Sequence, residues 1–176
     1  MYKRQVFRRD RLAAARRELD ENWNGWLSRL FAAVREECGG LAPQALPGGT
    51  GWEVLERRLH RAVDDLREAY GPGAFDPRRA VAVLDEMVRS AADFGHVNAH
   101  ERCRPTTACR HLPALAAQLA VASALTAWAR PVMPEGADRL AAALRVEPGR
   151  PVDWHALIPP LPGTRLAPPS GPVFGF

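Results

Sequence analysis

An alanine-rich segment from Leu115 to Leu144, interrupted by two prolines, most restricts how this chain of 176 residues can fold. Apolar residues recur in its first half at spacings of three and four, which predicts a helix with one buried, apolar face. Pro131 has no N–H to donate and must end that helix, whereas Pro134 suits the first turn of a new one. The segment therefore predicts a helix, a tight corner and a second helix.

Three further helices are predicted upstream. The first spans Asp10 to Val34, where Gly25 is a point at which it could bend, and Gly39 follows its end. The second has Thr50 as a candidate N-cap, and the third starts at Asp76 and Pro77, a favourable N-cap and first helical residue. We expect the third helix to pack against the central segment through its apolar residues: Val83, Leu84, Met87 and Val88.

No alternation typical of β-strands is present, so the predicted fold is all-α. We expect a bundle of about five helices over residues 6–150. Residues 151–176 form an extended, proline-rich C-terminal tail of the same domain, which packs back on the bundle. With 47% hydrophobic residues the chain can form a real core.

The first five residues differ in composition from the rest of the chain. Among 24 lysines and arginines the single lysine is Lys3, within the sequence Tyr2-Lys3-Arg4-Gln5. That sequence can be encoded by the end of a common sequencing adapter, so we interpret residues 1–5 as non-native. On this interpretation a catalytic domain upstream of Val6 is missing, and the alternative is a genuine short N-terminus.

Several segments resemble methionyl-tRNA synthetases, class I aminoacyl-tRNA ligases. "LTAWARPVMPEGADRLAAAL" is similar to the family's helix, Pro-x-Met-Pro-Glu corner and following helix, and "FDPRRAVAVLDEMVRSAADF" is similar to the helix before its anticodon-reading corner. The tail repeats the family's closing order in Trp154–Leu157, Leu161–Leu166 and Gly171–Phe174. The resemblance implies a C-terminal helical anticodon-binding domain in the cytoplasm, with tRNA and the parent's catalytic domain as partners. It assigns ATP and Mg²⁺ to that catalytic domain, and no cofactor to this chain.

The family reads the anticodon with an Asn and an Arg one helical turn apart, and with a Trp after the third helix. Arg29 matches the arginine, but Gly25 stands four residues earlier and Asn24 is displaced by one. No aromatic residue occurs at the position of the tryptophan, where Arg102 and Arg104 lie. The candidate tRNA contacts are therefore Asn24, Arg29, Arg102 and Arg104. The missing tryptophan removes a stacking contact worth about 1–3 kcal/mol, so we expect weak tRNA binding with little preference for the methionine anticodon.

No catalytic residues are predicted, because neither class I nucleotide signature nor a glycine-rich phosphate loop is present. Cys103, Cys109 and His111 lack the paired spacing of a zinc site, so no metal is expected. The net charge of +4 permits nucleic-acid contact, and we expect neither a membrane nor DNA as a partner. Two alternatives stay open: a domain of an amino-acid-activating enzyme of secondary metabolism that does not use tRNA, and a free-standing helical binding module.

Overall fold

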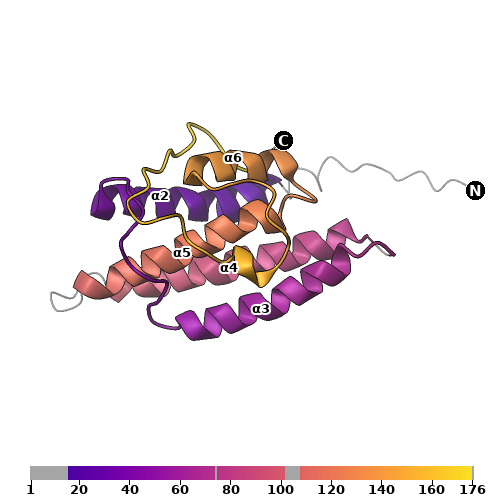
Figure 1. Cartoon of the computed structure of the whole chain (residues 1–176), viewed down its shortest axis with the longest axis horizontal. Helices are drawn as coiled ribbons and strands as arrows, with labels where there is room; N and C mark the ends of the chain where they lie inside the picture. Colours follow the sequence, from indigo (N-terminus) through magenta and orange to yellow (C-terminus); the bar gives the residue numbers. More distant parts are fainter. Residues whose placement is uncertain (1–15, 74, 102–107, 176) are drawn as a thin grey trace, which may run out of the picture.

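The computed structural model describes residues 16–73, 75–101 and 108–175 of the chain (Figure 1). Over these residues it forms five α-helices and no strand apart from an isolated bridge between Leu41 and Arg165, which confirms the predicted all-α bundle. A π-helical segment, η1 (Leu19–Asn24), leads directly into the first α-helix. The remaining elements are α2 (Gly25–Cys38), α3 (Trp52–Ala69), α4 (Pro77–Glu101), α5 (Ala108–Trp128), α6 (Pro134–Leu144) and the short 3₁₀ turn η2 (Trp154–Ala156).

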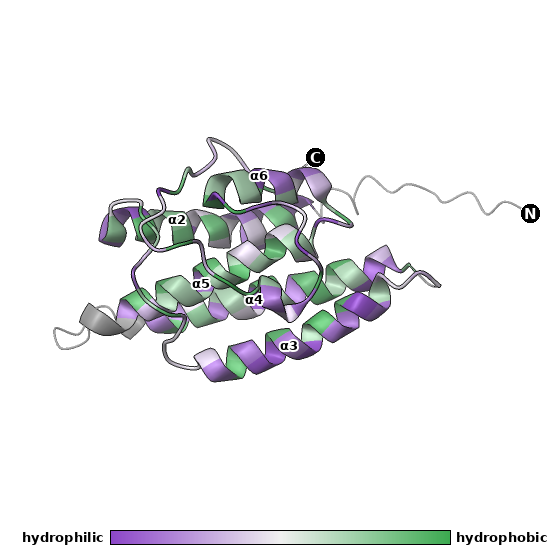
Figure 2. Cartoon of the chain, in the orientation of Figure 1, coloured by the Kyte–Doolittle hydropathy of each residue, from purple (hydrophilic) through white to green (hydrophobic). Residues whose placement is uncertain are grey.

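Helix α5 is the centre of the bundle. It contacts α2, α3, α4, α6 and η2, and in Figure 1 α2 and α6 lie on one side of it and α3 on the other. Every residue from 114 to 129 is buried, so the predicted single apolar face was too narrow. Its alanines let neighbours pack on all sides, whereas the hydrophilic residues of α3 in Figure 2 mark a helix with one side in water.

The corner between α5 and α6 forms as predicted. The backbone N–H groups of Val132 and Met133 both donate to the carbonyl of Ala129, at 3.1 and 2.7 Å, and Pro134 is the first residue of α6. The predicted core is also present, because Leu119, Leu125 and Trp128 belong to one buried cluster with the apolar residues of α4. Within it, Leu84, Met87 and Val88 are buried and Val83 is partly buried.

Two of the helix caps indicated by the sequence are present, and a third is not. Gly39 ends α2 in the left-handed conformation, and the Asp76 carboxylate accepts the N–H groups of Arg78 and Arg79, each at 3.0 Å. The N-cap of α3, however, is Gly51 and not Thr50. The Thr50 N–H donates to the side chain of Asn98 in α4 at 2.9 Å, which fixes Thr50 outside the helix.

Two helices are longer than predicted. The helix that begins the described chain continues to Cys38, beyond Val34, and its irregular part is the π-helical segment immediately before Gly25. Helix α5 starts at Ala108, one turn before the expected start at Leu112. It therefore contains Pro113, whose carbonyl accepts the N–H of Gly48 at 3.0 Å.

The C-terminal tail returns across the bundle, as expected. Its backbone pairs with the loop after α2, where the Ala42 N–H donates to Thr164 at 2.8 Å and the Leu166 N–H donates to Gly40 at 3.0 Å. The tail ends with a buried Phe174, 1% exposed, whereas Trp154 remains 51% exposed. None of the described helices is both long and apolar enough to cross a membrane.

Candidate nucleic-acid interface

A cleft of about 700 Å³ lies between α2, α4 and α5, and Arg29 is on its wall. We call it the α2–α4–α5 cleft. Its lining combines apolar residues with basic, acidic and amide side chains, which is the mixture expected of a site for a polar ligand. The residues that carry polar side chains are Asn22, Arg29, Glu36, Arg89, Asp93, His96, His111 and Gln118.

The floor of the cleft is closed by a tryptophan and a glutamine. The indole N–H of Trp26 donates to Oε1 of Gln118 at 3.2 Å, and Trp26 is only 2% exposed. Gly95 in α4 permits this arrangement, because a Cβ there would overlap the Gln118 amide. Trp26 therefore supports the cleft from below and does not offer a ring face to a ligand.

Arg29 is the cation most available to an anionic ligand in this cleft. It is exposed, and among the residues that the structure describes no carboxylate lies within ion-pair distance of it. Arg89 on the facing helix is different, since it pairs with Glu86 at 2.8 Å and with Glu18 at 3.8 Å. The guanidinium of Arg29 also lies close to Gly25, whose added Cβ would be 3.4 Å from one of its nitrogens.

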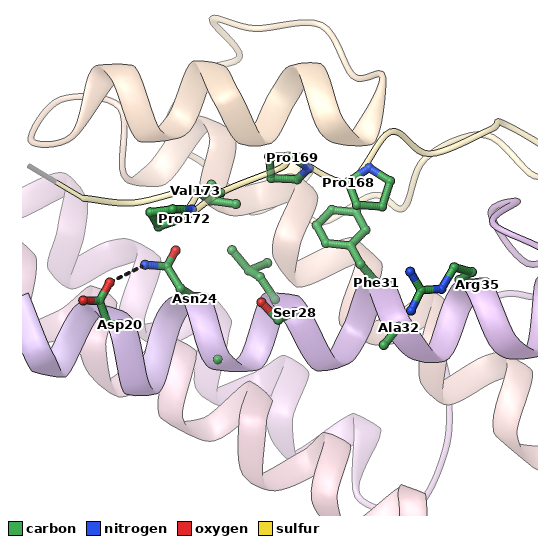
Figure 3. A pocket seen from close by; sticks show the side chains of 13 residues that line it. Asp20, Asn24, Ser28, Phe31, Ala32, Arg35, Pro168, Pro169, Pro172 and Val173 are labelled. Carbon is green, nitrogen blue, oxygen red and sulfur yellow. Dashed lines mark hydrogen bonds between the residues drawn. The ribbon is translucent and has the colours of Figure 1, made fainter.

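Asn24, the second predicted contact, does not face this cleft. It lines a separate groove of about 420 Å³ between α2 and the tail, together with Asp20, Pro172 and Val173 (Figure 3). Asn24 is 8% exposed, and its amide nitrogen donates to the carbonyl of Phe174 at 2.6 Å and to Asp20 at 3.1 Å. One residue of displacement rotates a side chain by about 100° around a helix, which separates Asn24 from Arg29.

The other two predicted contacts, Arg102 and Arg104, lie outside the described residues. Histidine at position 111 was considered in the sequence only as a zinc ligand, yet it borders the cleft. Its Nε2 lies 2.8 Å from Oε1 of Glu37. Over the described part of the chain, no group of three or more His, Cys, Asp and Glu side chains is arranged to hold a metal ion.

The fold is found in a known enzyme. Neither a family model nor a curated protein matches the chain. Among solved structures, the free form of methionyl-tRNA synthetase from Mycobacterium tuberculosis matches with a TM-score of 0.71 and 20% identity. The same enzyme in complex with methionyl-adenylate matches with a TM-score of 0.72, also at 20% identity. Each match covers 89% of this chain but only 31% of the synthetase, so the likeness establishes the fold of one part of a longer enzyme.

Proposed function

We propose that this chain is the helical tRNA-binding domain of a methionyl-tRNA synthetase-like ligase that acts in the cytoplasm. The fold supports this assignment, because it is the helical architecture found in the mycobacterial synthetase. Amino-acid activation with ATP and Mg²⁺ would belong to a catalytic domain outside this chain. The partners would then be tRNA and that catalytic domain.

Arg29 carries the proposal at the level of residues. A guanidinium group presents five N–H donors and pairs well with phosphates or with a base edge. No carboxylate of the described residues lies within ion-pair distance of Arg29, which stands beside a cleft large enough for an unpaired nucleotide. Arg29 can therefore bind RNA without first breaking an ion pair with another described residue.

Binding should tolerate many anticodon sequences. The described lining of the cleft contains one Trp, Tyr or Phe ring, that of Trp26, and it is buried. Stacking on an exposed aromatic ring is worth about 1–3 kcal/mol per base, and none of the described residues that line the cleft is an exposed tryptophan, tyrosine or phenylalanine. Gly25 adds no hydrogen bond at the position where the family has an asparagine. Most of the affinity would therefore come from phosphate contacts and would depend strongly on salt.

Positions 24 and 25 favour one alternative function. Gly25 has no side chain, and the amide of Asn24 is bound to the tail, so the asparagine and arginine pair that reads the anticodon in the family is incomplete. A parent enzyme of secondary metabolism, which activates an amino acid without tRNA, would not need that pair. This alternative predicts no tRNA binding even at low salt.

A binding titration separates the two functions. Three proteins are compared: the unchanged chain, its Arg29→Ala variant and its Arg61→Ala variant. Each is titrated at two salt concentrations with initiator tRNA and with a version of it that has a changed anticodon. Arg61 is an exposed arginine on α3, away from the cleft, and serves as the matched control. We expect similar affinity for both tRNAs, and a salt dependence that is lower by about one unit of slope in Arg29→Ala. Equal loss in the two variants would contradict the role of Arg29, and no binding at low salt would favour the alternative enzyme.

A further inference from the structure

The α2–α4–α5 cleft meets a second hollow across helix α2. Ala32, whose side chain is a single methyl group, lines both this cleft and the groove of about 420 Å³ between α2 and the C-terminal tail, which we call the α2–tail groove. Arg29 lines the cleft, and its guanidinium lies close to Gly25, which lines the groove. The two hollows are therefore joined over small side chains of α2, and Arg29 stands at their junction.

Arg35 is the cation of the α2–tail groove. It follows Ala32 by three residues, as Arg29 precedes it by three, so the two arginines are about 9 Å apart along the helix axis. Arg35 is exposed, and no carboxylate of the described residues lies within ion-pair distance of it. Each of the two hollows thus has an arginine on α2 that can bind an anion without first breaking an ion pair with another described residue.

Acidic side chains restrict where a phosphate can lie in the two hollows. Figure 3 shows Arg35 at one end of the α2–tail groove and Asp20 at the other, where its carboxylate would repel a phosphate. On the cleft side of α2, Glu36 does the same beyond Arg29, and Arg89 across the cleft is already paired with two glutamates. A phosphate backbone that contacts Arg29 therefore finds its next available cation on the other side of α2, at Arg35.

The rest of the groove lining suits the sugars and bases of such a strand. The exposed rings of Pro168 and Pro172 give the tail side an apolar surface, and Ser28 on α2 contributes an exposed hydroxyl group. A hydroxyl can donate to a phosphate oxygen or accept from a ribose hydroxyl. Mostly apolar walls with a few polar groups are typical of ligand sites.

We propose that a single-stranded segment of RNA leaves the α2–α4–α5 cleft across Ala32 and continues in the α2–tail groove, where Arg35 binds one of its phosphates. Arg29 binds another phosphate of the same strand at the junction. The inference rests on the proposed RNA-binding function and extends its contact surface to the C-terminal tail. Because phosphate contacts carry no base identity, Arg35 raises the affinity without adding a sequence preference.

The salt dependence of binding tests this path. A uridine hexamer labelled at its 5′ end is titrated with the whole chain at several salt concentrations and followed by fluorescence anisotropy. Each phosphate contact with a single strand contributes about 0.7 to the slope of log affinity against log salt. We expect Arg29→Ala and Arg35→Ala each to lower the slope by about this amount and the double variant to lower it by twice as much, whereas Arg61→Ala on α3 should leave it unchanged.

Ala32→Leu tests the crossing itself. Leucine favours helices and adds no charge, but its larger side chain obstructs the junction between the two hollows. This variant should lose the contact with Arg35, so its slope should fall by about 0.7 and should fall no further when Arg35→Ala is added. Thermal melting of each variant verifies that it is folded.

A further measurement needs no variant for its result. In a ¹⁵N spectrum of the arginine side chains, the Nε–Hε signals of Arg29 and Arg35 should shift with the hexamer, and that of Arg61 should not. An unchanged slope in Arg35→Ala, additive losses from Ala32→Leu and Arg35→Ala, or an unshifted Arg35 signal with bound hexamer would overturn the inference and leave RNA binding at Arg29 intact. Failure of the hexamer to bind at low salt would instead overturn the proposed function.

Discussion

The side-chain amide of Asn24 binds both backbone groups of Phe174. Its Nδ2 donates to the Phe174 carbonyl at 2.6 Å, and the Phe174 N–H donates to its Oδ1 at 3.0 Å. The ring of Phe174 then meets Trp23 edge-on, with 4.8 Å between the ring centroids. The C-terminal tail is thus held by the residue that immediately precedes α2.

Asn24→Ala should destabilise the domain, because it leaves the buried N–H and C=O groups of Phe174 without their hydrogen-bond partner. We expect a loss of about 2–4 kcal/mol in the free energy of unfolding, measured by urea denaturation. Amide hydrogen exchange of Val173 and Phe174 should accelerate more than that of α5. Ser28→Ala, on the exposed face of α2 one turn further, is the control and should change neither quantity. Equal unfolding midpoints for the two variants would contradict the role of Asn24.

The ring of Phe174 also occupies the space above Gly136 in α6, where an added Cβ would overlap it. Gly136→Ala should therefore cost about 1–3 kcal/mol through overpacking, even though alanine favours helices. Gly171→Ala in the tail is the control, since its Cβ would meet nothing within 4 Å. Phe174→Leu combined with Gly136→Ala should recover part of the loss. Thermal melting of the four proteins checks this, and a Gly136→Ala protein as stable as the Gly171→Ala protein would refute it.

Local features of the structure were predictable from the sequence. The corner after α5 follows from two prolines, and the start of α4 follows from Asp76 and Pro77, because a missing N–H and a capping carboxylate act on neighbouring residues. The contacts of Phe174 were not predictable in detail. They join residues far apart in the sequence, and nothing in the sequence around Gly136 shows that a ring would fill its space.

The candidate site was predicted in part. Arg29 borders the cleft between α2, α4 and α5, whereas the sequence did not indicate that Asn24 would be turned toward the tail. Their spacing of five residues, instead of four, was the available signal. The position of His111 at the border of this cleft could not be predicted, because the cleft forms only when three separate helices pack together.

Tyr70 should remain protonated to unusually high pH. Its hydroxyl donates to the carbonyl of Trp128 at 2.7 Å, and burial raises its pKa to about 12. The difference in absorbance between the unchanged protein and its Tyr70→Phe variant should show the phenolate of Tyr70 only near that pH.

The stability of the protein should depend on this proton. Because folded Tyr70 keeps a proton that it loses in the unfolded state, the stability of the unchanged protein should fall relative to the Tyr70→Phe variant as pH rises from the ordinary tyrosine pKa of about 10 toward 12. Near pH 7 the variant should be about 1 kcal/mol less stable, since the Trp128 carbonyl loses its donor. Phenolate absorbance appearing at the ordinary value would contradict the assignment.

Asp85 is a second group with a raised pKa, and it lies partly buried where α4 contacts η1. The indole N–H of Trp23 donates to its Oδ1 at 2.7 Å, and burial raises the pKa of Asp85, with that hydrogen bond acting against the rise. Asp85→Asn keeps an oxygen for Trp23 and removes the partly buried charge, so the variant should be the more stable protein at pH 7.

The pH dependence gives this prediction its sign. Because the folded carboxyl binds its proton more tightly than the unfolded one, the parent loses stability as pH rises from the unfolded pKa through the raised folded pKa. The variant lacks this titration, so its advantage should be smallest in acid and should grow to a constant value toward neutral pH. Urea denaturation of both proteins between pH 3.5 and 7 measures the difference, with Asp93→Asn on the exposed side of α4 as the control. An advantage that shrinks as pH rises would show that the Asp85 carboxylate stabilises the fold through its charge.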